Sequence, residues 1–184
     1  IKKESYDLDL YHKFLKQTFN HKKCTKSLIL GGGDGLPIRT MSGDITLVDI
    51  NSEWIDLNLK HPQLKLIHQN KLNNVNIIID NAFDFVKKTN KNFDCILVDF
   101  PEYESLENIR IHSLSFLKNL DEILDQDGLI IYQDDKEIQE NMVEIIKTTN
   151  YFAGFNTKIE KFPFRKKNNL TQIILTKKNK NISL

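Results

Sequence analysis

A glycine-rich stretch, "LILGGGDGLP" at residues 28–37, is the first feature of this sequence with the residue types of a ligand site. It places Gly31, Gly33 and Gly35 at alternate positions after an apolar run, where glycine permits positive φ and lets a ligand lie against the backbone. No Lys-Ser/Thr pair follows, which excludes a phosphate-binding P-loop. Asp34 stands among the glycines, and its charge would repel a phosphate or a carboxylate. The glycine spacing alone is a weak sign of a nucleoside site.

Two further apolar runs end in side chains that suit a nucleoside. Asp49 closes "ITLVD", at the place where an acid accepts hydrogen bonds from ribose hydroxyls. Asn81 and Ala82 follow the next run in "DNAF", where the Asn81 amide could hold an adenine edge. A glycine loop, an acid and an amide on consecutive strand ends together favour a nucleoside site. Each alone could instead cap a helix, and that alternative stays open for Asp49 and Asn81.

Carboxylates gather after the later apolar runs. Asp99 and Glu102 stand three residues apart in "LVDFPE", a spacing that suits a cation and a proton acceptor. "YQDD" brings Asp134 and Asp135 toward the same rim. A structural cap is the alternative for the first pair. We therefore expect an acidic mouth over the nucleoside pocket, which favours a polycationic substrate.

The elements that must position these residues alternate between strands and helices. Five short apolar runs, "SLILG", "ITLVDI", "VNIIID", "DCILVDF" and "GLIIYQ", are typical of strands covered on both faces. "FAGFNTKIEKF" and "LTQIILTK" predict a closing antiparallel pair. This pattern predicts an α/β, Rossmann-like fold with a methyltransferase-type, mainly parallel seven-stranded sheet and helices on both faces. The predicted helices lie at 36–42, 52–60, 81–89, 112–125 and 135–148.

Length and composition indicate one globular domain over residues 1–184, with a leading helix segment at 1–22 and a polar tail at 177–184. A net charge of +1 gives no general attraction to nucleic acid or membrane, and no apolar run is long enough to span a bilayer. The two cysteines, Cys24 and Cys95, have no motif spacing and are expected to be free thiols, which favours the cytoplasm. The five histidines lack metal-ligand spacing, so no metal site is expected.

Taken in order, the motifs resemble those of the spermidine synthase (polyamine aminopropyltransferase) family. "GGGDG" is similar to its donor loop, "LVDI" to its ribose acid, and "DNAFDFV…FDCILVD" to its adenine segment and catalytic strand. "DLDLYHKFL" resembles the D-E-x-x-Y-H-E-M helix of that family, which ordinary methyltransferases do not share. "DFPEYESLENIRIHS" looks most like the bacterial branch whose soluble domain often follows membrane helices. The resemblance covers about residues 7–135.

The resemblance implies a role for each residue around the donor, decarboxylated S-adenosylmethionine. His12 would contact this donor, and Asp34 would bind its amine. Asp49 would bind the ribose, with the glycine loop beside it. Asn81 stands where many members have Asp, so the implied adenine contact is altered.

The resemblance also implies an acceptor site and a reaction. Tyr11 would line the polyamine site, Asp99 would be the base, and Glu102 replaces the second Asp of the family in holding the acceptor; Asp134 is placed with them. A primary amine such as putrescine would take the aminopropyl group, and 5'-methylthioadenosine would leave. The implied enzyme is a transferase of alkyl groups other than methyl, active in polyamine biosynthesis without a permanently bound cofactor.

The chain also departs from the family. The β-hairpin domain that normally precedes the Tyr-His helix is not expected here, nor are membrane helices, and the loop that closes the polyamine pocket is reduced to "KFPFRKK". Three alternatives therefore stay open: a methyltransferase of the same fold, a non-catalytic nucleoside-binding relative, and nucleic-acid binding through the basic hairpin. A homodimer is one option for its assembly. Trp54 is expected to pack its helix.

Overall fold

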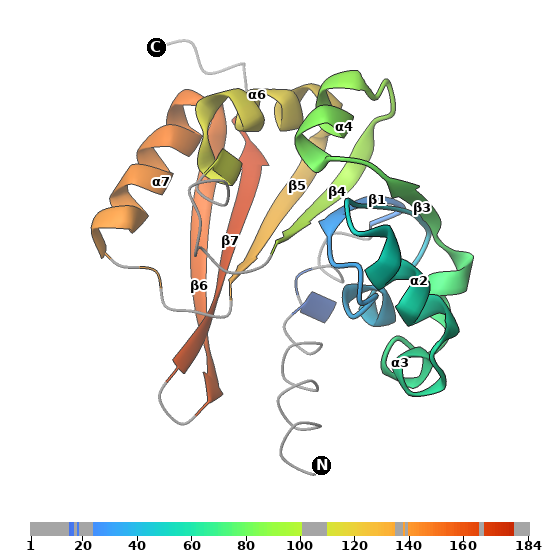
Figure 1. The fold of residues 1–184 in the computed structure, drawn as a ribbon. Coiled ribbons are helices and arrows are strands. Elements are labelled where there is room, and N and C mark those ends of the chain that lie inside the picture. Colours follow the sequence, from blue (N-terminus) through green and yellow to red (C-terminus); the bar gives the residue numbers. More distant parts are fainter. Residues whose placement is uncertain are drawn as a thin grey trace.

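A seven-stranded sheet forms the centre of the protein, with the strand order β3-β2-β1-β4-β5-β7-β6 (Figure 1). The computed structural model describes residues 15, 16, 18, 24–100, 110–134, 138, 140–165 and 168–178. Neighbouring strands are parallel except where β7 meets β5 and β6. The predicted α/β fold and its closing antiparallel pair are confirmed. The strands are β1 (Lys26–Gly31), β2 (Asp44–Asp49), β3 (Asn76–Ile79), β4 (Phe93–Asp99), β5 (Leu124–Asp134), β6 (Phe155–Arg165) and β7 (Asn168–Lys177).

The helices follow the prediction in part. The predicted helix at 36–42 is a single 3-10 turn, a helix not predicted follows α2 directly, and the helix before β5 ends where that strand begins. Proline at the first position starts both the unpredicted helix and the 3-10 turn, because its fixed φ suits a helix start. The helices are α2 (Ser52–Lys60), α3 (Pro62–Ile67), α4 (Ala82–Lys88), α6 (Leu114–Ile123) and α7 (Glu140–Phe152), with 3-10 turns η1 (Pro37–Thr40), η2 (Lys71–Asn74) and η3 (Arg110–His112).

Both faces of the sheet are buried, each in its own hydrophobic cluster. Leu28 and Leu30 of β1 belong to a cluster that includes residues of α4, α6 and α7, whereas Ile29 between them belongs to a cluster on the other face. Successive side chains of a strand point to opposite faces, so covering both faces requires apolar residues at every position. This is why the inner strands read as continuous apolar runs.

Polar caps hold the loops at the carboxyl ends of the strands. The Asn51 side chain accepts a hydrogen bond from the backbone N–H of Trp54 and starts α2, and Asn81 accepts one from Phe83 and starts α4. Ser113 caps α6 in the same way. Each such cap contributes about 1 kcal/mol. Two of these caps directly follow β2 and β3, so they also fix the loops that border the expected ligand site.

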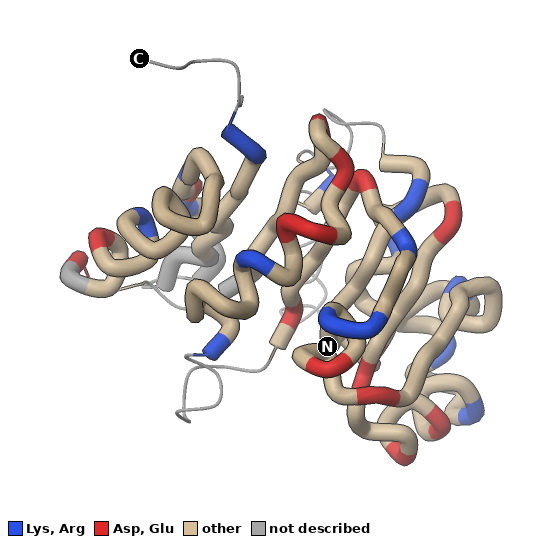
Figure 2. Tube along the Cα trace, turned by 90° about the horizontal axis from the view of Figure 1, so that it is seen from above, with Lys and Arg blue, Asp and Glu red and all other residues tan. Residues whose placement is uncertain are grey.

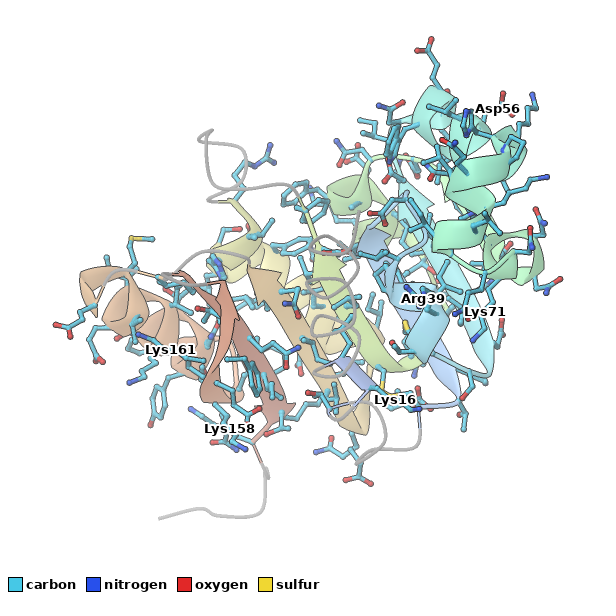
Figure 3. All side chains as sticks on the ribbon, turned by 90° about the horizontal axis from the view of Figure 1, so that it is seen from below. Lys16, Arg39, Asp56, Lys71, Lys158 and Lys161 are labelled. Atoms are coloured by element: carbon cyan, nitrogen blue, oxygen red, sulfur yellow. A yellow bond between two sulfur atoms is a disulfide. The ribbon has the colours of Figure 1, made fainter. Side chains whose placement is uncertain are left out.

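The 3-10 turns η1 and η2 are joined by a hydrogen bond from the side chain of Lys71. The Lys71 ammonium donates to the carbonyl oxygen of Arg39 at 2.8 Å, and the two residues lie close together in Figure 3. η1 begins two residues after Gly35 and η2 lies beside η1, so this contact joins the segment that follows the glycine loop to a second turn.

The amino ends of β1 and β4 are joined by a disulfide between Cys24 and Cys95, whose Cα atoms are 5.8 Å apart. The prediction of free thiols is therefore wrong. The two cysteines are 71 residues apart in the sequence, and only the pairing of β1 with β4 brings them together. Asp94 reinforces this junction, since its carboxylate accepts hydrogen bonds from Thr25 and from the backbone of Lys26. The cytoplasm was inferred from free thiols, so the disulfide removes this argument, and the cytoplasmic location stays a prediction.

Acidic and basic residues are interspersed along the described trace, in keeping with the net charge of +1 (Figure 2). Within the described ranges, no helix is both long and apolar enough to cross a membrane.

The disulfide should contribute measurably to stability, because it restricts the unfolded chain over a long loop. We expect Cys24→Ser to lower the free energy of unfolding by roughly 2–4 kcal/mol, measured by urea denaturation under oxidising conditions. A reducing agent should lower the stability of the native sequence by a similar amount and leave that of Cys24→Ser unchanged. Equal stability of the two proteins without reductant would contradict the prediction.

Candidate functional site

The glycine loop turns away from β1 at a point where the backbone of β4 is very close. Gly31 pairs with Asp99 across the sheet, and a Cβ at Gly31 would lie 2.3 Å from the Asp99 carbonyl oxygen. Gly32 donates its N–H to that same oxygen at 3.1 Å, and the Gly35 N–H closes the turn onto the Gly32 carbonyl at 2.9 Å. Gly31, Gly32 and Gly35 all have positive φ. Only glycine adopts such a run of conformations without strain.

Gly33 is needed for a different reason, because its φ is not positive. Its N–H donates to Asp49 Oδ2 at 3.0 Å, and a Cβ at Gly33 would lie 2.6 Å from that oxygen. The other carboxylate oxygen, Oδ1, accepts the N–H of Asn51 at 2.8 Å. Asp49 is thus held by one backbone donor on each oxygen. Each oxygen keeps a further lone pair with which it can accept a ligand hydroxyl.

The loop after β3 presents a cap and an aromatic group. Asn81 Oδ1 accepts the Phe83 N–H at 2.9 Å, so the helix cap left open by the sequence is present. The Asn81 amide nitrogen is then the part of this side chain that can donate to a ligand. The Phe83 ring stacks at 6.1 Å on Phe100 and lies under the guanidinium of Arg110, which is 4.8 Å from the ring centre. Ala82, which has a small side chain, lies between Asn81 and Phe83 and is the first residue of α4.

Asp34 is partly buried at the tip of the glycine loop. Burial raises the pKa of the Asp34 carboxyl above its usual value, while the Leu36 N–H, donating to Oδ1 at 2.9 Å, lowers it. The Asp49 carboxylate raises the pKa further. His68 is fully buried behind the loop, where a Cβ on Gly35 would come within 3.0 Å of it. The partly buried Asp34 carboxyl thus lies within electrostatic range of a second carboxylate, that of Asp49.

These elements enclose a pocket of about 600 Å³ at the carboxyl ends of β1, β2, β3 and β4. Its described lining contains the carboxylates of Asp34, Asp49 and Asp99 and no Lys, Arg or His. The acidity is local, because charges of both signs are mixed elsewhere along the trace (Figure 2). Such a pocket attracts a cation. The lining residues are Gly31, Gly32, Gly33, Asp34, Val48, Asp49, Ile50, Asn51, Trp54, Asn81, Ala82, Phe83, Asp99, Phe100 and Ile111.

Most of the residues predicted for the donor lie in this lining. Gly35 does not, because it closes the turn behind the loop against His68. Asp134 ends β5, where its backbone pairs with Thr171, and its side chain lies outside the described part. Three further predicted residues also lie outside the described residues, namely Tyr11, His12 and Glu102.

The sequence did not single out several lining residues. Gly32 shares the glycine run, and Phe100 directly follows Asp99, so both could have been found from their neighbours. Trp54 is 41% exposed, lies in neither hydrophobic cluster and lines the pocket. The expectation that Trp54 packs its helix is therefore wrong. Its position five residues after Asp49 was the available signal.

Comparison with known proteins identifies the family. Residues 8–183 match the family model described as the spermine/spermidine synthase domain. The chain belongs to this family. It is 32% identical over 143 residues to polyamine aminopropyltransferase 2 of Aquifex aeolicus, covering 72% of this chain and 29% of that protein. It is 28% identical over 177 residues to the polyamine aminopropyltransferase of Shewanella oneidensis, covering 84% of this chain and 30% of that protein.

Solved structures of the family agree with the fold. The spermidine synthase from Thermotoga maritima has a TM-score of 0.67 at 19% identity, covering 92% of this chain and 60% of that one. A spermidine synthase in complex with the transition state analogue AdoDATO has a TM-score of 0.66, also at 19% identity, covering 90% of this chain and 58% of that one. The chain spans less than a third of the length of the two curated relatives. Family membership thus fixes the fold of the domain.

The close approach of β1 to Asp99 predicts that alanine destabilises the protein more at Gly31 than at Gly154, although the two glycines have similar φ. Gly31 and Gly154 have φ of 84° and 97°, but a Cβ at Gly154 meets nothing within 4 Å. We expect Gly154→Ala to lower the free energy of unfolding by about 1–2 kcal/mol through backbone strain alone. Gly31→Ala should lower it by roughly a further 1–3 kcal/mol, because the new methyl group overlaps the Asp99 carbonyl. Equal losses in urea denaturation would show that this contact does not constrain the loop.

Proposed function

We propose that this chain transfers an aminopropyl group from decarboxylated S-adenosylmethionine to a di- or polyamine such as putrescine and releases 5'-methylthioadenosine. The observation that carries the proposal is the pocket with three carboxylates and no basic residue in its described lining. The names of the curated relatives support the same reaction. Both proposed substrates are cations.

The charges of the donor fit the charges of the pocket. Decarboxylated S-adenosylmethionine carries a sulfonium and a terminal ammonium, and it has no carboxylate. We assign the ammonium to Asp34 and the ribose hydroxyls to Asp49, whose oxygens are already oriented by Gly33 and Asn51. A charge pair at about 4 Å is worth roughly 1–4 kcal/mol between water-like and surface-like dielectrics. The carboxylate of ordinary S-adenosylmethionine would be repelled at the same place, which argues against a methyltransferase.

The proposed chemistry is a displacement at the carbon next to the sulfonium. The lone pair of a primary amine forms the new C–N bond, the C–S bond breaks, and its electron pair neutralises the sulfur. Free amines titrate near pH 10.4, so the acceptor arrives as an ammonium, which the Asp99 carboxylate attracts. Before the attack the ammonium must pass one proton to Asp99, which frees the lone pair, and the new secondary amine then keeps its positive charge. Tyr11, Glu102 and Asp134 are proposed to hold the far end of the amine.

The reaction changes the charge of the nucleoside. The donor is a double cation, whereas methylthioadenosine is a neutral thioether. The three pocket carboxylates therefore attract the donor more strongly than the product. In this scheme the donor is a co-substrate, and neither a metal nor a permanently bound cofactor takes part.

The first test is turnover. Decarboxylated S-adenosylmethionine mixed with putrescine, cadaverine, agmatine or spermidine should yield methylthioadenosine with at least one amine, detected by chromatography. Asp99→Asn should lower kcat by roughly 10²–10⁴-fold, because the base is lost while its size is kept. Asp127→Asn, an exposed carboxylate outside the pocket lining, is the matched control and should leave kcat unchanged. No product with any amine, or full activity of Asp99→Asn, would overturn the proposed reaction.

Asp34 should govern the choice of donor. We expect Asp34→Asn to reduce the preference for decarboxylated over ordinary S-adenosylmethionine by about tenfold or more, measured by competition calorimetry. Because the pKa of Asp34 is raised, the carboxyl takes up a proton as the pH falls toward the acidic range and then no longer attracts the ammonium. The KM for the donor should therefore rise as the pH falls, and Asp34→Asn should flatten this limb.

Asp34→Asn should weaken donor binding but stabilise the free protein. A raised pKa means that the ionised form of Asp34 costs folding free energy above that pKa, so Asp34→Asn should raise the melting temperature at neutral pH. This gain should shrink as the pH is lowered through the pKa. An unchanged donor preference together with an unchanged melting temperature would show that Asp34 has neither role.

A further inference from the structure

Trp54 is connected to the ribose acid by a short, fixed path. The Trp54 N–H donates to Asn51 Oδ1 at 2.9 Å, and the Asn51 N–H donates to Asp49 Oδ1 at 2.8 Å. Both bonds lie within the first turn of α2 and the loop before it. The backbone of Trp54 is therefore held close to Asp49 in the sequence and in space, and its side chain lines the pocket.

Trp54 does not serve the hydrophobic core. It is 41% exposed, whereas its neighbour Ile55 is 4% exposed and packs with the core cluster on that face. Ile50, on the same wall, is 69% exposed. Large apolar side chains left open inside a concave site are typical of a surface that a ligand covers. An indole is also a costly group to expose, because it carries a large apolar area.

The backbone that carries Trp54 is held from behind. The Asn58 side-chain amide donates to the Trp54 carbonyl oxygen at 2.9 Å. The Asn58 carbonyl accepts the Nε2–H of His68 at 3.0 Å, and His68 Nδ1 accepts the Leu72 N–H at 3.4 Å. Asn58 and His68 are both fully or almost fully buried. A ligand surface that is built on such a support keeps its position, so little freedom is lost when a ligand binds.

We propose that Trp54 forms a wall of the nucleoside subsite and packs against the ribose and purine of the donor and of its product. Asp49 beside it can accept the vicinal hydroxyls of a ribose, and the Asn81 amide across the pocket can donate to a purine ring. The proposal rests on the proposed function for the identity of the nucleoside. It adds a binding residue that favours purine nucleosides over the free amine. In this scheme the aminopropyl end of the donor is assigned to Asp34 and Asp99, and Trp54 contacts only the nucleoside.

The test uses the fact that Trp54 is the single tryptophan of the chain. Methylthioadenosine is titrated into the protein while tryptophan emission is recorded at red-edge excitation, and calorimetry measures binding in parallel. Saturation should change the emission with the same dissociation constant that calorimetry gives. Putrescine alone, up to the same concentration, should leave the emission unchanged.

Substitutions separate a binding role from a structural one. Trp54→Ala should weaken methylthioadenosine binding about tenfold or more, and Trp54→Phe by less, as expected when a base–aromatic contact is removed or reduced. The donor KM should rise by a similar factor, with a smaller change in kcat. Leu66→Ala removes another apolar side chain that is 73% exposed but lies on α3 outside the pocket lining, and it should leave the affinity unchanged. The melting temperature of free Trp54→Ala should match that of the native chain.

The outcomes distinguish this proposal from the proposed function. If calorimetry detects methylthioadenosine binding but emission stays constant and Trp54→Ala binds normally, the role of Trp54 is overturned and the proposed reaction stands. If the nucleoside binds with the expected emission change but no amine is converted, the role of Trp54 is supported and the proposed reaction fails. If calorimetry detects no methylthioadenosine binding to the native chain, the role of Trp54 is overturned, and the turnover assay alone decides the proposed reaction.

Discussion

The backbone of β1 passes so close to the carbonyl group of Asp99 that residue 31 has no room for a side chain. The other features of the pocket depend on this approach. The loop can leave β1 only through a run of positive-φ glycines, and this turn brings the Gly33 N–H onto Asp49 and places Asp34 at the tip. The same close approach of β1 to β4 holds the Asp99 side chain beside the glycine loop. One close contact between parallel strands thus sets the relative positions of three carboxylates that come from different parts of the sequence.

The ionised Asp34 carboxylate opposes the stability of the free protein. Burial and the charge of Asp49 both raise the pKa of Asp34, which means that ionising this carboxyl is less favourable in the folded chain than in the unfolded one. A cation bound beside Asp34 would reverse that preference, because an opposite charge lowers the pKa of a carboxyl. The described lining itself contains no Lys, Arg or His. The strand pairing and the buried faces of the sheet must offset the unfavourable part.

Much of the fold follows from local patterns, because strands covered on both faces must be apolar at every position. The glycine loop, Asp49, Asn81 and Asp99 could be predicted for the same reason, since each directly follows such a strand. What escaped prediction depends on contacts between distant segments. The cysteine pair is joined only through the β1–β4 neighbourhood, and Gly35 faces His68 rather than the pocket. Trp54 looked like a packing residue, because the sequence does not show which side of α2 is covered. The roles of Tyr11, His12, Glu102 and Asp134 stay predictions.

The disulfide and the glycine loop lie at opposite ends of the same two strands. At one end Cys24 is covalently joined to Cys95, and at the other Gly31 faces Asp99 across a gap that tolerates no added atom. A strand that slipped along its neighbour by one residue would exchange its two faces and move Asp99 away from the loop. The disulfide prevents that slip, because it joins the two strands near their amino ends. The alignment of Asp99 with the glycine loop is thereby fixed from the amino-terminal ends of the two strands, at a distance from the pocket.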